Sequence, residues 1–219
     1  MFEEAAKKIE EKGILPVIKV ENADDALCIA RSLRAGGLNA MELTFRTANG
    51  EEGYERIGEC IRLVSEKEPD MLVGAGTVLN PFLAKRAMLS GAKFIVSPGF
   101  NSETVEFCLS KNFPVFPGVY TPSEIEVALS HGLRTLKFFP ADSGGGIPFI
   151  KAMAGPFADV KFICAGGINL SNLESYMRLS NVSACCMSQI AENQLIEKKD
   201  WAEITRRTKE CMKILKGIS

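Results

Sequence analysis

The sequence predicts a closed parallel (β/α)8 barrel, the TIM-barrel fold, with an extra N-terminal helix. Short apolar runs alternate with helical patterns along all 219 residues, which gives eight strand–helix units. No linker or low-complexity stretch interrupts them, so residues 1–219 are predicted to form a single domain. An open doubly wound sheet is the alternative, but its Gly-x-Gly-x-x-Gly turn after the first strand is missing. Gly74-x-Gly76 follows the third strand and lacks the third glycine.

Each element has its own signal. The amphipathic segment 1–9 predicts the extra helix rather than a signal peptide. Asn80-Pro81 and Thr121-Pro122 combine a capping side chain with a first-turn proline, so each predicts a helix start. Apolar runs predict strands near residues 14–20, 39–45, 71–75, 93–97, 114–117, 134–139, 160–164 and 182–187. Helical patterns lie near residues 22–35, 50–67, 80–90, 102–112, 122–131, 147–154, 169–179 and 198–215.

Charge and composition argue against several classes of partner. The formal net charge is −1 with dispersed basic residues, so we expect no nucleic-acid partner. No apolar stretch approaches the roughly 20 residues that span a bilayer, so we expect no membrane partner. Seven cysteines without a Cys-x-x-Cys pair, and a single histidine, predict reduced core thiols in a cytoplasmic protein and no metal site. Cys185-Cys186 could form a redox pair, but neighbours on a strand point to opposite faces.

Lys137 is the first candidate for chemistry. It lies within the mostly apolar run 133–140, which is typical of a short buried strand. Desolvation disfavours the ammonium form of a lysine in an apolar site, and a neutral lysine attacks carbonyl carbon to form a Schiff base. The alternative is a structural lysine that covers the strand end while its ammonium group reaches water.

The predicted second strand supplies polar partners for this lysine. Glu42, Thr44 and Arg46 alternate with apolar residues, so they share one face. A half-exposed antiparallel strand would give the same pattern, but in a parallel barrel the polar face must point inward. Three inward polar groups indicate a site, with Glu42 as a general acid/base and Arg46 as a fork for a substrate carboxylate. The same parity turns Lys137 and Phe139 inward, with Phe139 as an apolar wall.

Small and polar residues follow other predicted strands, at the end where parallel barrels place their active sites. Thr77 either donates a hydroxyl there or is an ordinary turn residue. Gly166-Gly167 precede a predicted helix and can offer backbone N–H groups to an anion such as phosphate. Ser188 and Lys19 could complete that pocket.

Together these residues resemble the family of 2-dehydro-3-deoxy-6-phosphogluconate (KDPG) and 4-hydroxy-2-oxoglutarate (KHG) aldolases. The resemblance runs almost the whole length of the chain. Its most specific segments are residues 42–47 (ELTFRT), 73–81 (VGAGTVLNP), 97–99 (SPG) and 136–140 (LKFFP), and residues 154–157 and 166–168 also match.

The resemblance implies a metal-free class I aldolase, without an organic cofactor, that acts on a small 2-keto acid and is usually a homotrimer. It implies the following roles: Lys137 forms the Schiff base, Glu42 is the general acid/base, Arg46 and Thr77 bind the pyruvyl carboxylate, and Pro98 and Phe139 line the pocket.

A mechanism follows from that resemblance. Lys137 attacks the C2 ketone of a 2-keto-3-deoxy-4-hydroxy acid, with KDPG as the first choice, and water leaves. The protonated imine is then the electron sink that a metal or cofactor would otherwise supply. Glu42, through a water, takes the C4 hydroxyl proton, the C3–C4 bond breaks, and pyruvate and glyceraldehyde 3-phosphate result. The implied setting is carbohydrate metabolism through the Entner–Doudoroff route.

Two departures from the family pattern concern the phosphate pocket. Ala165 stands where the family commonly has threonine, and Cys186-Met187 stand where a glycine-rich turn is common. Side chains there are expected to crowd the backbone N–H groups that would hold phosphate. We therefore predict that retro-aldol chemistry survives and that preference for the 6-phosphate weakens.

Two rival functions stay open. One is an aldolase for 4-hydroxy-2-oxoglutarate or another unphosphorylated or isomeric 2-keto acid, since the pair Glu42 and Lys137 does not discriminate among these. The other is a non-catalytic barrel that binds small anions. Binding alone does not require a nucleophile beside a base, and this favours the enzyme.

Overall fold

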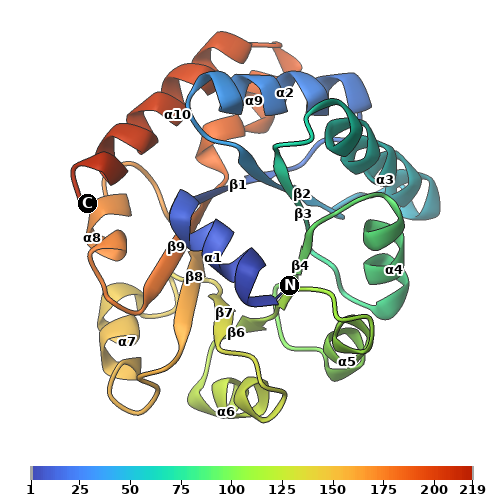
Figure 1. The fold of residues 1–219 in the computed structure, drawn as a ribbon. Coiled ribbons are helices and arrows are strands. Elements are labelled where there is room, and N and C mark those ends of the chain that lie inside the picture. The colour runs from blue at the N-terminus through green and yellow to red at the C-terminus, as the bar shows by residue number, and fades with distance from the viewer. Residues whose placement is uncertain (1, 219) are drawn as a thin grey trace.

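The computed structural model describes residues 2–218, which form a ring of parallel strands surrounded by helices (Figure 1). The strand order is β5-β4-β3-β2-β1-β9-β8-β7-β6, and every pair is parallel. The predicted barrel is therefore confirmed. The strands are β1 Ile14–Ile18, β2 Ala40–Thr44, β3 Leu72–Gly76, β4 Phe94–Val96, β5 Val115–Phe116, β6 Gly118–Val119, β7 Thr135–Phe138, β8 Lys161–Ala165 and β9 Val182–Met187.

The predicted fifth strand is interrupted, which explains why nine strand segments make an eight-unit barrel. Pro117 separates β5 from β6, because proline has no N–H for the ladder. The first half pairs with β4 and the second half with β7, so this one stretch of chain closes the ring. The Pro117 carbonyl still accepts a hydrogen bond from the Lys137 N–H at 2.9 Å.

Helices cover the outside of the ring (Figure 1). They are α1 Phe2–Lys12, α2 Ala23–Ala35, α3 Gly50–Lys67, α4 Pro81–Leu89, α5 Ser102–Ser110, α6 Pro122–Ser130, α7 Gly146–Met153, α8 Leu173–Met177, the 3₁₀ turn η1 Gln189–Ala191, α9 Asn193–Glu197 and α10 Trp201–Lys216. The extra N-terminal helix is confirmed from Phe2 onward, and Met1 lies outside the described residues. η1 and α9, between β9 and α10, were not predicted. In residues 2–218 no helix is long and apolar enough to cross a membrane.

Local capping explains why the predicted helix starts are correct. The Asn80 side chain accepts a hydrogen bond from the Leu83 N–H at 2.9 Å, ahead of the proline that opens α4. Thr121 and Glu124 form a reciprocal capping box at the start of α6. These contacts involve only residues three apart, so they can be read from the sequence.

Helix α1 crosses one end of the ring, in front of the strands in Figure 1. Its own residues Ala5 and Ile9 are buried, and the ring of its residue Phe2 lies 5.4 Å from the Phe116 ring. Because α1 leads directly into β1, the covered end is the one where strands begin. The open end, where strands finish, is the end at which parallel barrels carry their chemistry.

Candidate active site

Lys137 and Glu42 meet inside the barrel although β7 and β2 are not neighbouring strands. The distance from Lys137 Nζ to Glu42 Oε1 is 3.9 Å. Lys137 is 6% exposed and Glu42 is fully buried. This burial excludes the alternative in which the lysine reaches water. The inward parity predicted for both side chains is therefore confirmed.

Glu42 has the electrostatics of a proton-transfer group. Burial raises the pKa of its carboxyl group, and the positive charges of Lys137 and then Arg46 oppose that rise. Neither carboxylate oxygen has a hydrogen-bond partner within residues 2–218. A carboxyl group with a raised pKa and free oxygens is suited to accept and return a proton.

An aromatic ring lies near the Lys137 ammonium group. The Lys137 Nζ atom lies 5.4 Å from the centre of the Phe139 ring, within cation–π range. Phe139 is 38% exposed, so its ring reaches the surface of the protein. Its peptide bond to Pro140 is cis.

Cys186 is a neighbour of Glu42 and Lys137 that was not predicted to lie in the cavity. It stands opposite Leu15 on β1 and Ala165 on β8, and strand parity places it on the same inward face as Lys137. The charges of Glu42 and Lys137 both act on its thiol, but burial dominates and raises its pKa to about 12. The thiol therefore stays protonated. Strand parity was the signal that could have found it.

Arg46 lies just beyond the end of β2, with an exposed side chain. Its Nε donates a long hydrogen bond of 3.4 Å to Thr44 Oγ1, and the Thr44 hydroxyl in turn donates to the Ile18 carbonyl at 3.1 Å. Arg46 forms no ion pair within 4.0 Å of a carboxylate in the described part of the chain, so its guanidinium is available to an anion.

Thr77 and Pro98 follow the next two strands around the mouth, and both are half-buried. The backbone of Thr77 has φ +56°, which is a strained conformation for a β-branched residue. Backbone strain of this kind clusters at functional sites. The Pro98 carbonyl packs closely against Gly118, which leaves no room for a side chain at that position.

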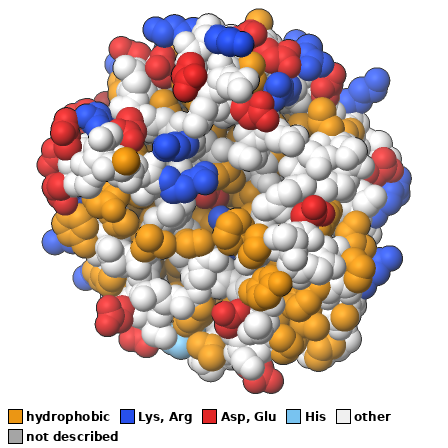
Figure 2. Space-filling view, turned by 180° about the vertical axis from the view of Figure 1, so that it is seen from behind, with side chains coloured by type: hydrophobic (Ala, Val, Ile, Leu, Met, Phe, Trp, Pro, Cys, Tyr) orange, Lys and Arg blue, Asp and Glu red, His pale blue; other side chains and the backbone are white. Residues whose placement is uncertain are grey.

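Three of the predicted anion ligands come together on one side of the mouth. Lys19, Arg46 and Ser188 follow the adjacent strands β1, β2 and β9, and they line one pocket together with residues 17 and 191–194. Seen from the side opposite α1, the surface is hollowed near its centre, with basic side chains along one edge and apolar ones along the other (Figure 2).

Gly166 and Gly167 have φ values of +95° and +82°, a conformation that favours glycine. Gly166 packs against Phe139 and Pro140, and the Asp142 side chain lies against Gly167. The pairing of Ala165 with Cys186 brings this turn next to the end of β9, where Ser188 follows.

The expected crowding by Met187 is wrong. The Met187 Sδ atom lies 3.9 Å from Cys211 Sγ on α10, so this side chain packs outward, away from the mouth. The expectation treated Cys186 and Met187 alike, whereas neighbours on a strand point to opposite faces. Of these three residues, Ala165 and Cys186 face the interior and Met187 does not.

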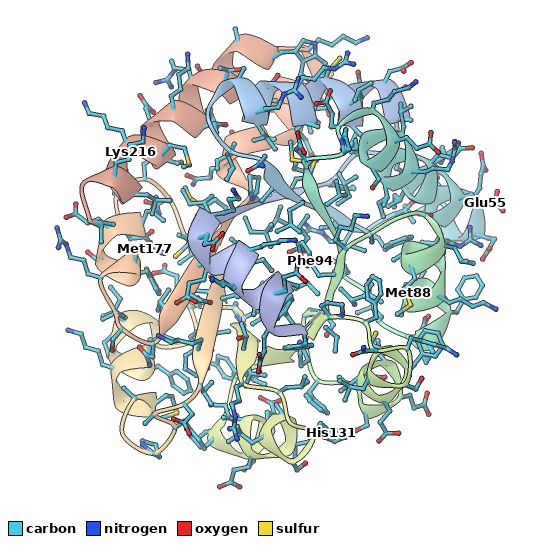
Figure 3. The ribbon with its side chains drawn as sticks, viewed as in Figure 1. Glu55, Met88, Phe94, His131, Met177 and Lys216 are labelled. Carbon is cyan, nitrogen blue, oxygen red and sulfur yellow. The ribbon has the colours of Figure 1, made fainter. Side chains whose placement is uncertain are left out.

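The single histidine lies away from the barrel centre. His131, at the outer edge in Figure 3, ends α6, and its Nδ1 lies 2.9 Å from the Val127 carbonyl. Within residues 2–218 no three His, Cys, Asp or Glu side chains gather in a way that could hold a metal ion. All seven cysteines are free, and six of them are buried.

Comparisons with known proteins agree with this geometry. A family model described as KDPG and KHG aldolase matches residues 5–207. A 2-dehydro-3-deoxy-phosphogluconate aldolase of Haemophilus influenzae is 41% identical over 210 residues, which are 96% of each chain. Its counterpart from Pseudomonas aeruginosa is 40% identical over 202 residues, 92% of this chain and 89% of that one.

Solved structures extend the agreement to three dimensions. The KDPG aldolase of Legionella pneumophila, with pyruvate captured as a covalent carbinolamine, superposes with a TM-score of 0.87 at 35% identity, covering 96% of this chain and 97% of that chain. The Zymomonas mobilis enzyme with 3-phosphoglycerate gives 0.86 at 32% identity and 96% of both chains. The chain therefore belongs to the KDPG and KHG aldolase family and is a lyase of the class I aldolase type.

Proposed function

We propose that this aldolase cleaves KDPG to pyruvate and glyceraldehyde 3-phosphate through a Schiff base on Lys137. The observation that carries the proposal is the buried Lys137 Nζ, 3.9 Å from a fully buried Glu42 carboxyl group that has no hydrogen-bond partner in residues 2–218. Such a nucleophile beside such a base suits imine chemistry and has no use in a simple anion-binding barrel.

In the proposed reaction, Lys137 passes a proton to the Glu42 carboxylate, and the freed amine attacks C2 of the substrate. The Glu42 carboxyl group then protonates the carbinolamine hydroxyl, which leaves as water and gives a protonated imine. Glu42, through a water, takes the proton of the C4 hydroxyl. The electrons of the C3–C4 bond then move to the iminium, and the aldehyde leaves. The same carboxyl group returns a proton to C3 of the enamine, and water releases pyruvate from Lys137. The iminium supplies the electron sink, so the scheme needs no metal and no organic cofactor.

The mouth of the barrel supplies two sets of binding groups. We propose that Arg46 and Thr77 hold the carboxylate next to C2, with Pro98 and Phe139 as walls. On the other side of Arg46, the distal anionic end of the substrate would meet Gly166, Gly167, Ser188 and Lys19. The strand order supports this assignment. Thr77 and Arg46 follow β3 and β2, whereas the distal groups follow the next three strands β1, β9 and β8, so the two sets lie side by side around the mouth.

The names of the most similar relatives favour KDPG, and the carbinolamine in the Legionella protein favours a covalent lysine. Three features weaken the case for a strong phosphate preference. Ala165 offers no hydroxyl, Cys186 narrows the inner wall, and the Asp142 carboxylate lies beside Gly167. The second candidate is therefore an unphosphorylated 2-keto-4-hydroxy acid such as 4-hydroxy-2-oxoglutarate. Steady-state kcat/KM for phosphorylated and unphosphorylated substrates separates the two, and a strong phosphate preference would exclude the second candidate.

We further propose that the enzyme works in the cytoplasm as a homotrimer. The seven free thiols fit a reducing compartment. Three large apolar side chains at and near α4 are more than half exposed, namely Leu79, Phe82 and Leu89, and they offer an apolar face to another copy of the chain.

Borohydride trapping with pyruvate, followed by intact mass and peptide mapping, tests the proposed function. A reduced pyruvyl adduct on Lys137 is expected, and Lys137→Met should give none. The absence of an adduct in folded wild-type protein that still binds pyruvate would overturn the Schiff-base mechanism and favour a binding protein.

A further inference from the structure

Strand β3 carries no side chain at two successive inward positions, Gly74 and Gly76. In the register with β2, Glu42 stands opposite Gly74, and Thr44 stands opposite Gly76. Both glycines therefore belong to the same inward-facing row. Each leaves a notch in the inner wall of the barrel, and different side chains occupy the two notches.

Phe94 occupies the notch at Gly74. A methyl group built at Gly74 would overlap the Phe94 ring, with the ring Cδ2 atom at 2.6 Å. Phe94 belongs to β4, is fully buried and lies towards the middle of the ring of strands in Figure 3. The Gly74 notch is thus a packing feature of the apolar core.

The Glu42 side chain occupies the notch at Gly76. A methyl group built at Gly76 would overlap the Oε1 and Cδ atoms of Glu42 and stand 2.6 Å from its Cγ. From a backbone position opposite Gly74, the side chain therefore leans along the sheet towards the open end. In that position Oε1 faces Lys137 Nζ at 3.9 Å, and both oxygens are left without a donor in residues 2–218.

We propose that Gly76 is a positioning residue for Glu42: the missing side chain at position 76 lets the carboxyl group lie where it exchanges a proton with the imine-bound substrate. A side chain at 76 would force the carboxyl group out of its notch. The neighbouring notch cannot receive it, because Phe94 already fills that space. This inference rests on the proposed function, since Gly76 acts in that reaction only through Glu42.

The test compares Gly76→Ala with Gly74→Ala, a matched substitution on the same strand. Gly76→Ala should lower kcat by about 10²–10³-fold, within the range that a positioned acid/base contributes. Pyruvate trapped on Lys137 at equilibrium should stay within about threefold of wild type, because a displaced proton-transfer group slows the chemical steps more than it changes the adduct's stability. Gly74→Ala should lower thermal stability through Phe94 and keep kcat within about threefold wherever the variant is folded.

Non-additivity separates positioning from a merely structural role. In a Glu42→Gln background, Gly76→Ala should change the residual kcat by less than about twofold, since the group that it displaces no longer transfers protons. Gly76→Ala with wild-type kcat would overturn the proposal. The proposal would also be overturned if Gly76→Ala lowered kcat by the same factor in wild type and in the Glu42→Gln background.

A second variant keeps the proposal testable if Gly76→Ala does not fold. Glu42→Asp shortens the side chain and vacates the notch, so the combined Gly76→Ala and Glu42→Asp variant should fold and form the pyruvyl adduct. Failure of that variant to fold would overturn the proposal. Failure of the proposed function would look different, because wild-type protein itself would give no adduct on Lys137.

Discussion

Replacing Lys137 by methionine should abolish turnover, leave the fold intact and create a new pH dependence of stability. Methionine keeps an unbranched apolar stem that can pack beside Phe139. Glu42 stays fully buried, without a hydrogen-bond partner in residues 2–218, and loses the cation that has the larger effect on its pKa. The variant therefore contains a buried carboxyl group whose charge only Arg46 helps to stabilise.

The distance of 3.9 Å between Lys137 Nζ and Glu42 Oε1 sets the size of the effect. At an effective dielectric constant of about 20, two unit charges at this separation attract by roughly 4 kcal/mol. Burial already raises the pKa of Glu42, so losing Lys137 raises it further. The carboxyl group can then take up a proton, and the cost in unfolding free energy stays below that figure.

A carboxyl group with a higher pKa in the folded than in the unfolded state favours folding at acid pH, and that contribution is lost as pH rises. For Lys137→Met, the unfolding free energy should fall by up to about 1.4 kcal/mol per pH unit above the unfolded pKa of about 4.3, until the pH passes the folded pKa of Glu42. In wild type the fall should end at a lower pH, because Lys137 lowers the pKa of Glu42.

Urea denaturation followed by circular dichroism at several pH values measures these slopes. The Lys137→Met variant, the Glu42→Gln variant and their combination complete the comparison with wild type. Adding Glu42→Gln to Lys137→Met should remove the extra slope, because the titrating group is gone. If the extra slope survives that substitution, or if Lys137→Met and wild type have the same slope at every pH, Lys137 and Glu42 are not electrostatically coupled.

Three further predictions concern single side chains. Thr77→Gly should leave the unfolding free energy unchanged or raise it by up to about 1 kcal/mol, because glycine relieves the strain at φ +56°. The KM should rise, because the hydroxyl group is lost. A loss of stability in urea denaturation would contradict this prediction. Arg46→Lys should raise KM about tenfold in steady-state assays with little change in Tm, since lysine keeps the charge but loses the bidentate fork. Thr121→Ala should cost about 1 kcal/mol of unfolding free energy and leave kcat unchanged, because it removes only the cap of α6.

The parts of the fold that depend on short-range contacts were predictable. The asparagine cap of α4 and the threonine cap of α6 each bond to a residue three positions along the chain, so both helix starts could be predicted from the sequence. The predicted helix 169–179 was too long, and only Leu173–Met177 is α-helical. The Asn169 side chain accepts from the Ser171 N–H at 2.9 Å, and the Asn172 side chain accepts from the Asn169 N–H at 2.8 Å. These local bonds compete with the helix ladder, and the periodicity of apolar residues does not reveal them.

The meeting of Glu42 and Lys137 was predictable because the period of two holds along a whole strand. Strand parity predicts that the Glu42 and Lys137 side chains point inward, and the interior of a closed barrel is a single cavity. Strand parity also explains why the Met187 side chain points outward. The prediction was wrong because it treated Met187 like its neighbour Cys186, which points inward. The left-handed backbone of Thr77 had no sequence signal, because tertiary packing rather than local preference imposes it.

Neither carboxylate oxygen of Glu42 has a hydrogen-bond partner in residues 2–218. A buried carboxyl group without hydrogen-bond donors is costly, and a stable barrel would place a donor beside it. Here the inner wall next to it is Gly76, which supplies no side chain, and the donor that is missing from residues 2–218 is one that a substrate hydroxyl or its bridging water can provide. Bound substrate can therefore add a donor that the protein itself does not provide. A buried carboxyl group that gains such a donor on binding is suited to the proton transfer proposed for Glu42.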